Sequence, residues 1–353
     1  MLTWLMVIVV FSVLVLVHEL GHLFAARRAG IRVEAFSVGM GKRVVGLKIG
    51  DTDYRLSLIP FGGYCKMAGE EPGEASGERG ELASSPPGHR FWVMAAGSIT
   101  NYLFAFLIFW GIFMIGVPTL TNEVGTVLKG YPAEKAGIVP GDTILAINGD
   151  RVAYWDDVVK AIARGSSAER SLHMEVERSG VVMPLDVKPQ ISTVKNVFGQ
   201  TISRPLIGIS PVERATSVRY SFLRAGYEGG RKLLELTAMT YKGIWLIFTG
   251  GMPLKTSVSG PIGIAHMMKD AAALGVVPLL IIMAHVSMAL AVFNLLPFPI
   301  LDGGHIIFLG IEKLRGKPLS VRTQERVTNV ALAMLVGFAL FVSFQDVMKF
   351  WGK

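Results

Sequence analysis

Four long apolar runs are the strongest pattern in the chain, at residues 2–26, 91–117, 276–296 and 327–347. As an α-helix, each run is long enough to cross the hydrocarbon core of a bilayer. A cleaved secretory signal fits the first run poorly, because no basic residue precedes it and no small-residue cleavage site ends it. The pattern therefore predicts a polytopic α-helical membrane protein with four transmembrane helices.

The stretch between the second and third runs has a different pattern. Residues 118–212 alternate short strand-like runs with turn signals around one helical segment, which predicts an inserted α+β domain. Residues 213–275 form a linker whose first part is amphipathic, and we expect a helix lying in the outer membrane interface. A fifth span over 233–248 is the alternative, but that run is short and charged. The flanking parts, 1–117 and 276–353, are the predicted membrane cores.

Charge gives an orientation to these spans. Of the 353 residues, 51% are hydrophobic and 18% are charged, and the net charge is +8. The basic residues cluster beside the apolar runs, so we expect no nucleic-acid partner. By the positive-inside rule, the segments between spans one and two and between spans three and four are cytoplasmic. Both termini and the insert then lie outside, in the periplasm or its equivalent. Cys65 is the one cysteine and is interpreted as structural.

The stretch "VHELGH", residues 17–22, lies near the end of the first apolar run and contains three ionisable groups. His18 and His22 are one helical turn apart, so both imidazoles point from one face toward a common point, and Glu19 lies between them. This H-E-x-x-H arrangement is typical of a zinc peptidase whose glutamate is the general base. A buried polar cluster is the plainer interpretation, but ionisable groups in a span are costly and indicate function.

A catalytic zinc needs a third protein ligand. The stretch "NLLPFPILDGGHIIF", residues 294–308, places Asp302 just after the third run. Its prolines, Pro297 among them, interrupt the helix, and Gly303 permits close backbone approach. Both motifs lie at the cytoplasmic ends of their spans and can therefore meet. Asp302 is the favoured third ligand, and His305 is its rival.

These motifs resemble the site-2 protease family of zinc intramembrane metalloproteases, and within it the bacterial regulators of sigma-E. The likeness runs nearly end to end. "FSVGMGKRV" and "YRLSLIPFGGYCKMAGE" resemble the family's membrane-dipping β-hairpin, within 31–90, "AAGSITN" its G-x-x-x-N feature, and "SGPIGI" the segment before span three. "GYPAEKAGIVPGD" and "ILAINGD" resemble a single PDZ domain in the insert.

The resemblance implies specific roles and a substrate. His18, His22 and Asp302 would bind Zn²⁺, Glu19 would be catalytic, and Asn294 would hold the substrate backbone. The substrates would be single-pass membrane proteins of the anti-sigma type, already trimmed outside, or remnant signal peptides, in a bacterial inner membrane. Lipid is a further partner, and a peptide tail is a candidate partner of the PDZ domain. The candidate substrate-binding residues are Asn294, Pro297, Gly303, Gly62 and Gly63.

Several interpretations stay open at this stage. The stretch 54–61 either offers a strand edge to an unwound substrate or is a plain structural strand. "PLIGI", residues 205–209, is a candidate carboxylate-binding loop. Asn101 is interpreted as a helix–helix hydrogen bond, Gly97 as a close-packing position and His285 as a buried polar contact. The alternative function is a non-enzymatic membrane scaffold that binds partner tails through its PDZ domain.

Overall fold

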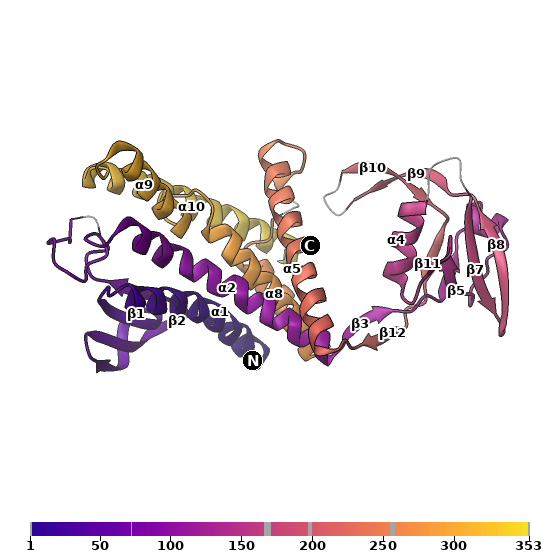
Figure 1. Ribbon diagram of the computed structural model, residues 1–353, viewed down its shortest axis with the longest axis horizontal. Coiled ribbons are helices and arrows are strands. Elements are labelled where there is room, and N and C mark those ends of the chain that lie inside the picture. Colours follow the sequence, from indigo (N-terminus) through magenta and orange to yellow (C-terminus); the bar gives the residue numbers. More distant parts are fainter. Residues whose placement is uncertain (1, 72, 166–170, 197–199, 255–257, 352–353) are drawn as a thin grey trace. The chain divides into compact units, whose positions relative to one another are not determined.

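The computed structural model describes residues 2–71, 73–165, 171–196, 200–254 and 258–351 (Figure 1). Its contacts divide the chain into two units. The helical unit comprises Met1–Ile112, Leu223–Ile244 and Pro253–Lys353, and the insert unit comprises Phe113–Phe222 and Trp245–Met252.

All four apolar runs are helical, as predicted. They are α1 (Leu2–Arg28), α2 (Pro87–Ile115), α8 (Val276–Asn294) and α10 (Val321–Trp351). Among the described residues, these are the helices long and apolar enough to cross a membrane. α2 and α10 begin several residues before the apolar runs, because their polar first turns extend the helix beyond the apolar stretch. Pro87 at the start of α2 suits the first turn, where its missing N–H leaves no hydrogen bond unmade.

The segment after α1 contains two long paired strands, β1 (Val33–Ile49) and β2 (Thr52–Met67). The pairing is double, since Tyr54 pairs with Phe36 and also with Leu47. Of the two interpretations of 54–61, the structural strand is therefore correct for the first residues, whose backbone is already paired on both sides. The later part of β2 pairs with the first part of β1, as Gly63 does with Val38, and it lies along α1.

α5 (Phe222–Phe248) packs across α2 within the helical unit. A Cβ at Gly229 would lie 3.1 Å from the backbone nitrogen of Trp110, so the glycine allows the two helices to approach closely. The Tyr102 and Thr237 hydroxyl groups lie 3.0 Å apart and join the two helices by a hydrogen bond. α5 is long enough to span a membrane, with 27 residues, but it is not among the helices apolar enough to do so.

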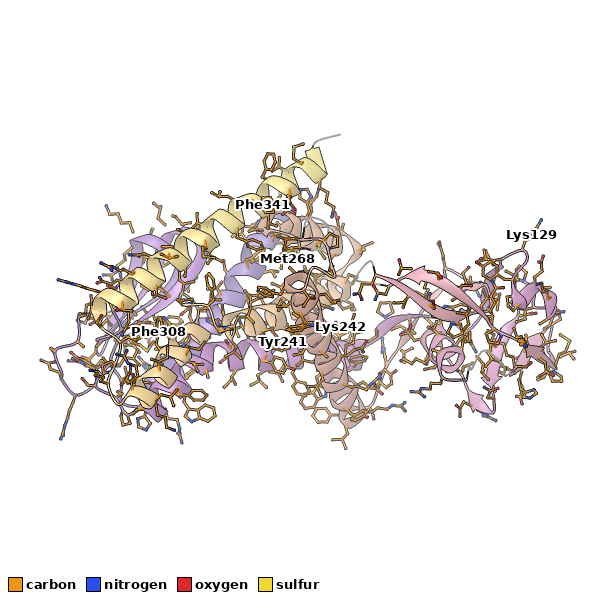
Figure 2. The ribbon with its side chains drawn as sticks, turned by 90° about the horizontal axis from the view of Figure 1, so that it is seen from above. Lys129, Tyr241, Lys242, Met268, Phe308 and Phe341 are labelled. Carbon is orange, nitrogen blue, oxygen red and sulfur yellow. The ribbon has the colours of Figure 1, made fainter. Side chains whose placement is uncertain are left out.

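α7 (Pro261–Leu274) also lies in the range predicted as a linker, 213–275. Its Met268, labelled in Figure 2, is fully buried and packs with Val7, Val10 and Leu14 of α1. The second part of that range is therefore a core helix of the helical unit and not an amphipathic surface segment. The physical reason is its apolar, small-residue sequence, which carries few polar groups that require water.

A buried carboxylate holds the start of α7. Asp346 of α10 is 4% exposed, and its Oδ2 accepts a 2.7 Å hydrogen bond from the backbone N–H of Gly263. That N–H belongs to the first turn of α7, where no carbonyl inside the helix can accept it. Any side chain at Gly263 would meet the same carboxylate at 3.0 Å. Asp346 thus joins α10 to α7.

The insert unit has an α+β fold. An antiparallel sheet has the strand order β6-β5-β7-β8, and three further strand pairs are β11-β4, β12-β3 and β10-β9. Buried positions alternate along β7, so one face of the sheet packs on a core formed by Val124, Ile144, Ile147, Leu172, Met174, Val176 and Val187. The strands are β3 (Val117–Leu120), β4 (Val124–Val127), β5 (Thr143–Ile147), β6 (Asp150–Arg151), β7 (Leu172–Arg178), β8 (Val181–Val187), β9 (Gln190–Lys195), β10 (Thr201–Leu206), β11 (Ile209–Pro211) and β12 (Ala215–Val218), with helices α3 (Pro132–Lys135) and α4 (Trp155–Gly165).

The insert unit is longer than the predicted range 118–212 at both ends. β3 and β12 pair with each other, Val117 opposite Val218, and this pairing closes the base of the unit. Because the two strands are far apart in sequence, the apolar pattern of either one alone does not reveal the pairing.

Replacing Asp346 by Ala is expected to destabilise the chain, because the buried Gly263 N–H loses its acceptor. We expect a loss of about 1–3 kcal/mol, seen as a lower melting temperature of the chain purified in detergent. Asp270→Ala is the matched control, because Asp270 is exposed on α7, the helix that Asp346 holds. It should leave the melting temperature unchanged. Equal melting temperatures for Asp346→Ala and wild type would show that this carboxylate does not hold α7.

Candidate metal centre

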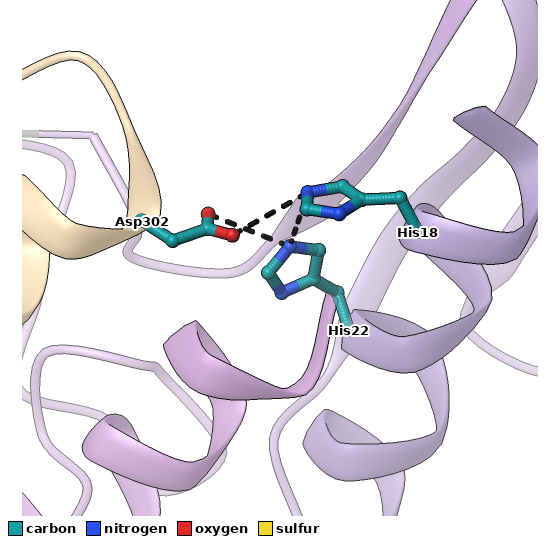
Figure 3. A group of neighbouring side chains, drawn as sticks. All are labelled: His18, His22 and Asp302. Carbon is teal, nitrogen blue, oxygen red and sulfur yellow. Dashed lines mark hydrogen bonds and ion pairs between the residues drawn. The ribbon is translucent and has the colours of Figure 1, made fainter. Parts of the chain in front are cut away.

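Three side chains converge between α1 and the start of α9 (Asp302–Arg315) (Figure 3). His18 Nε2 lies 3.4 Å from Asp302 Oδ2, and His22 Nε2 lies 3.5 Å from Asp302 Oδ1. The two Nε2 atoms are 3.3 Å apart. Each residue offers one ligand atom, and these atoms lie within 4.8 Å of one another. The two histidines of one helix and an aspartate far along the chain thus meet at one point.

This triangle has the size that a tetrahedral zinc site requires. With zinc–nitrogen distances near 2.0–2.1 Å, ligand atoms of a regular tetrahedron lie about 3.3–3.4 Å apart. The two Nε2 atoms are 3.3 Å apart, and each lies 3.4 or 3.5 Å from a different oxygen of the Asp302 carboxylate, so the separations are close to this size. Two imidazoles and one carboxylate are a ligand set of catalytic zinc, and three ligands leave a fourth position open. The donor atoms therefore fit a zinc ion.

Contacts from α2 orient two of the ligands. His22 Nδ1 lies 2.8 Å from the backbone oxygen of Val93, which accepts its N–H and leaves Nε2 free to bind metal. The Ser98 hydroxyl, fully buried, donates to Asp302 Oδ2 at 3.5 Å. Neither Val93 nor Ser98 was predicted from the sequence. Ser98 carries a signal, a serine within an apolar span, but the Val93 contact is made by backbone and has none.

The two helices that build the site touch through glycines. A Cβ at Gly97 of α2 would lie 2.4 Å from His22 Nε2 and 2.6 Å from His18 Cε1. A Cβ at Gly21 of α1 would lie 2.2 Å from Thr100 Oγ1. Gly97 was interpreted as a close-packing position. It packs against the ligand imidazoles themselves, so any side chain there would occupy their space.

Comparison with known proteins identifies the family of this chain. A model of peptidase family M50 matches residues 6–338. The chain belongs to peptidase family M50. A Clostridium perfringens protein named as a zinc metalloprotease is 37% identical, with 96% of each chain covered. A Campylobacter jejuni protein with the same description is 31% identical over 98% of this chain and 93% of that one.

A regulator of sigma-E protease from Salmonella typhimurium is 29% identical, with 96% of this chain and 97% of that one covered. Its alignment runs over 438 positions, more than the 353 residues here, so that protein has segments that this chain lacks. Among solved structures, a PDZ domain from Listeria monocytogenes covers 26% of this chain and 86% of its own, at 20% identity and a TM-score of 0.21. A likeness of that strength does not bear on the fold, and the PDZ assignment stays a prediction.

As a member of family M50, the chain is a zinc metalloprotease with four helices apolar enough to span a membrane. The predicted resemblance, the enzymatic class and the zinc cofactor are thereby confirmed. The alternative of a non-enzymatic scaffold does not fit this family.

The other predicted residues of the M50 chain lie at different distances from the ligands. Asn294, the last residue of α8, has its Nδ2 3.3 Å from His18 Nε2. A Cβ at Gly63 of β2 would lie 3.7 Å from Glu19 Cγ, so this strand passes beside the glutamate. Gly62, inside the same strand, adopts a φ of +81°, a backbone conformation that favours glycine. Pro297 lies away from the ligands and lines an apolar cavity of 540 Å³.

Gly303 has a role in packing. A Cβ there would lie 2.3 Å from the backbone oxygen of Leu296 and 2.4 Å from that of Leu295. The glycine therefore lets the start of α9 fold back on the end of α8, which positions the neighbouring Asp302. His305, the rival ligand, does not belong to the ligand cluster and contacts the Phe308 ring instead.

Three further interpretations have mixed outcomes. His285 makes a polar contact as predicted, its Nδ1 2.6 Å from the Ile281 oxygen, but it is half-buried and not buried. Asn101 joins α2 to α8 through its backbone oxygen, which accepts from the Ser287 hydroxyl at 2.8 Å, while its side-chain amide has no partner among the described residues. Burial raises the pKa of the Cys65 thiol to about 12, and the Glu19 carboxylate adds to the shift, so the thiol stays protonated near neutral pH.

Gly97→Ala is expected to weaken zinc binding, because its methyl group would overlap both imidazoles. Loss of an oriented ligand costs roughly 10–100-fold in metal affinity, measured as zinc content after challenge with a graded chelator. Gly111→Ala on the same helix is the matched control, since a Cβ there meets nothing within 4 Å. Wild-type zinc retention by Gly97→Ala would contradict the role given to this glycine.

Proposed function

We propose that this M50 metalloprotease cuts peptide bonds within the transmembrane segments of single-pass proteins, with His18, His22 and Asp302 holding zinc and Glu19 as general base. One observation carries the proposal. Two of the three clustered ligands, His18 and His22, belong to a helix that is itself long and apolar enough to span a bilayer. A protease for soluble chains has no need to bury its metal site in such a helix.

Glu19 is the proton-transferring residue in this proposal. Zinc, when bound, supplies the Lewis acidity that activates water and polarises the scissile carbonyl. The Glu19 carboxylate takes a proton from the attacking water and delivers it to the leaving amide nitrogen. A backbone hydrogen bond from Cys65 on β2 holds the carboxylate beside the site. Glu19 is not one of the three clustered ligands, so its replacement should leave zinc in place.

Substrate binding requires backbone partners, because a transmembrane helix exposes its peptide bonds only when it unwinds. Among the described residues Gly63 pairs with Val38 alone, so the later part of β2 keeps one edge unpaired, and a Cβ at Gly63 would lie 3.7 Å from Glu19 Cγ, which places the strand beside the glutamate. An unwound substrate strand can add to this edge by β-augmentation. The Asn294 amide, next to His18, then holds the substrate backbone on the opposite side. Gly62, Pro297 and Gly303 shape the two segments that present these groups.

The orientation follows from the basic segments. The chain lies in an inner membrane. Its parts between α1 and α2 and between α8 and α10 lie on the cytoplasmic side, and the insert unit lies on the outer side. His18 and His22 are in the second half of α1, toward the cytoplasmic face. The substrates are single-pass proteins of the anti-sigma type, already trimmed outside, and remnant signal peptides. The insert unit is a PDZ domain that takes a peptide tail at 205–209, where Gly208 has a φ of +83°.

Glu19→Gln is expected to abolish cleavage of a single-pass transmembrane reporter by the full chain in detergent. Removal of a general base lowers the rate by about 100-fold or more, while zinc content stays at the wild-type level. The measurement is the rate of product formation, with the cut position determined by mass spectrometry. A cut inside the membrane segment that a zinc chelator also stops is the expected wild-type result.

Glu34→Gln is the matched control, since this glutamate is exposed on β1, and it should cleave like wild type. Cleavage by Glu19→Gln at the wild-type rate would refute the assignment of the base. Cleavage only outside the membrane segment would refute the intramembrane substrate.

A further inference from the structure

Asp302 is the ligand whose position is least determined by regular structure. Residues 295–301 before it form turns and not helix, and α9 itself is only 14 residues long. α9 meets the rest of the helical unit through side chains: Ile306 packs against the core that includes Val93 and Met94, and Ser98 and Arg90 contact Asp302 and Glu312. Side-chain contacts must therefore set where α9 lies, and with it the Asp302 carboxylate.

The contacts of α9 with α2 form two matched stripes. On α2, Arg90, Met94 and Ser98 are spaced by four residues and share one face. On α9, Asp302, Leu309 and Glu312 recur at helical spacing on one face. Ser98 contacts Asp302 at one end, and Arg90 contacts Glu312 at the other, with Nη1–Oε1 at 3.0 Å. Met94 and Leu309 are both buried and lie between these contacts, beside one cavity of 430 Å³.

The lengths of the two stripes are compatible with two simultaneous contacts. From Arg90 to Ser98 a helix rises about 12 Å, and from Asp302 to Glu312 about 15 Å. Two contact points at the ends of α9 fix its tilt as well as its distance from α2. The contact at Ser98 is long at 3.5 Å, and the packing of Ile306 is apolar, so the ion pair at the far end is the contact that fixes the direction of α9 most strongly.

Each charge of this ion pair has the same sign as the partial charge at the nearby end of its own helix. Arg90 lies near the positive N-terminal end of α2, and Glu312 lies in the last turn of α9, near its negative C-terminal end. Each charge is therefore unfavourable within its own helix and favourable only toward the other. The pair is also partly buried, with side chains 20% and 23% exposed, so water screens it less than a surface pair.

We infer that the Arg90–Glu312 ion pair is a positioning contact that clamps α9 to α2 and thereby holds Asp302 at the metal centre. The inference deepens the proposed function and rests on Asp302 being a zinc ligand. The same helix α2 fixes His22 through Val93 and both imidazoles through Gly97, so the clamp places the third ligand relative to the same helix as the first two.

The test is the zinc affinity of the purified full chain, measured by competition with a chromophoric chelator. Arg90→Gln and Glu312→Gln are each expected to weaken zinc binding by about tenfold, as for outer partners of metal ligands. Arg90→Lys keeps the charge and should bind zinc like wild type. The exchanged pair, Arg90→Glu with Glu312→Arg, should recover most of the affinity lost in either single exchange.

The matched controls come from a second Arg–Glu pair that touches neither α2 nor α9. Arg32 and Glu78 lie 3.1 Å apart and are 45% and 65% exposed. Arg32→Gln and Glu78→Gln should leave zinc affinity unchanged. Melting temperatures of the zinc-free variants separate a loss of folding from a loss of metal binding, because the clamp acts on affinity in chains that remain folded.

Two results would overturn the inference. One is wild-type zinc affinity in folded Glu312→Gln, whatever its melting temperature. The other is a folded exchanged pair that recovers none of the lost affinity. Asp302→Asn separates this outcome from a failure of the proposed function: if that variant binds zinc like wild type, the ligand set itself is wrong, independently of Arg90 and Glu312.

Discussion

The architecture of the site depends on how closely α1 and α2 approach each other. Gly21 and Gly97 lack the side chains that would keep the two backbones apart, and a Cβ at either position would overlap atoms of the opposite helix. In a bilayer, lipid tails are as apolar as leucine, so such close packing takes the place of the hydrophobic effect between helices. Once α2 lies this close, its Val93 carbonyl reaches His22 and its Ser98 hydroxyl reaches Asp302. One helix thereby orients ligands from two distant parts of the chain.

The same closeness would let a bound metal ion stabilise the arrangement. Two imidazoles and a carboxylate lie within 3.5 Å of one another in a mostly buried setting, and His22 is 6% exposed. Taking such groups out of water is costly unless they are paired or bind a metal. Zinc binding to preorganised ligands compensates for that cost, so metal affinity and the folded arrangement of the helical unit are coupled.

The sequence predicted the elements far better than the contacts between them. Four apolar runs, the H-E-x-x-H spacing and Asp302 after a proline-broken span were all visible, because each is a local pattern with a direct physical meaning. The double pairing of β2 was not visible, since a period of two does not say how many neighbours a strand has. α7 was missed as a core helix because its burial depends on Val7, Val10 and Leu14, far along the chain. The Val93 contact could not be seen at all, because every residue has a carbonyl.

The site combines residues on regular helix with residues on irregular backbone. His18, Glu19 and His22 stand on an uninterrupted helix whose backbone groups are satisfied internally, which keeps their spacing fixed. In the proposed function, the segments that face a substrate are a strand edge beside Gly63 and the turns after Asn294, where backbone groups are not all used within one helix. A substrate helix that unwinds in the membrane loses its own hydrogen bonds and needs replacements at the same depth. Irregular backbone that would be a liability against lipid is therefore useful here, provided it lies beside the metal ligands.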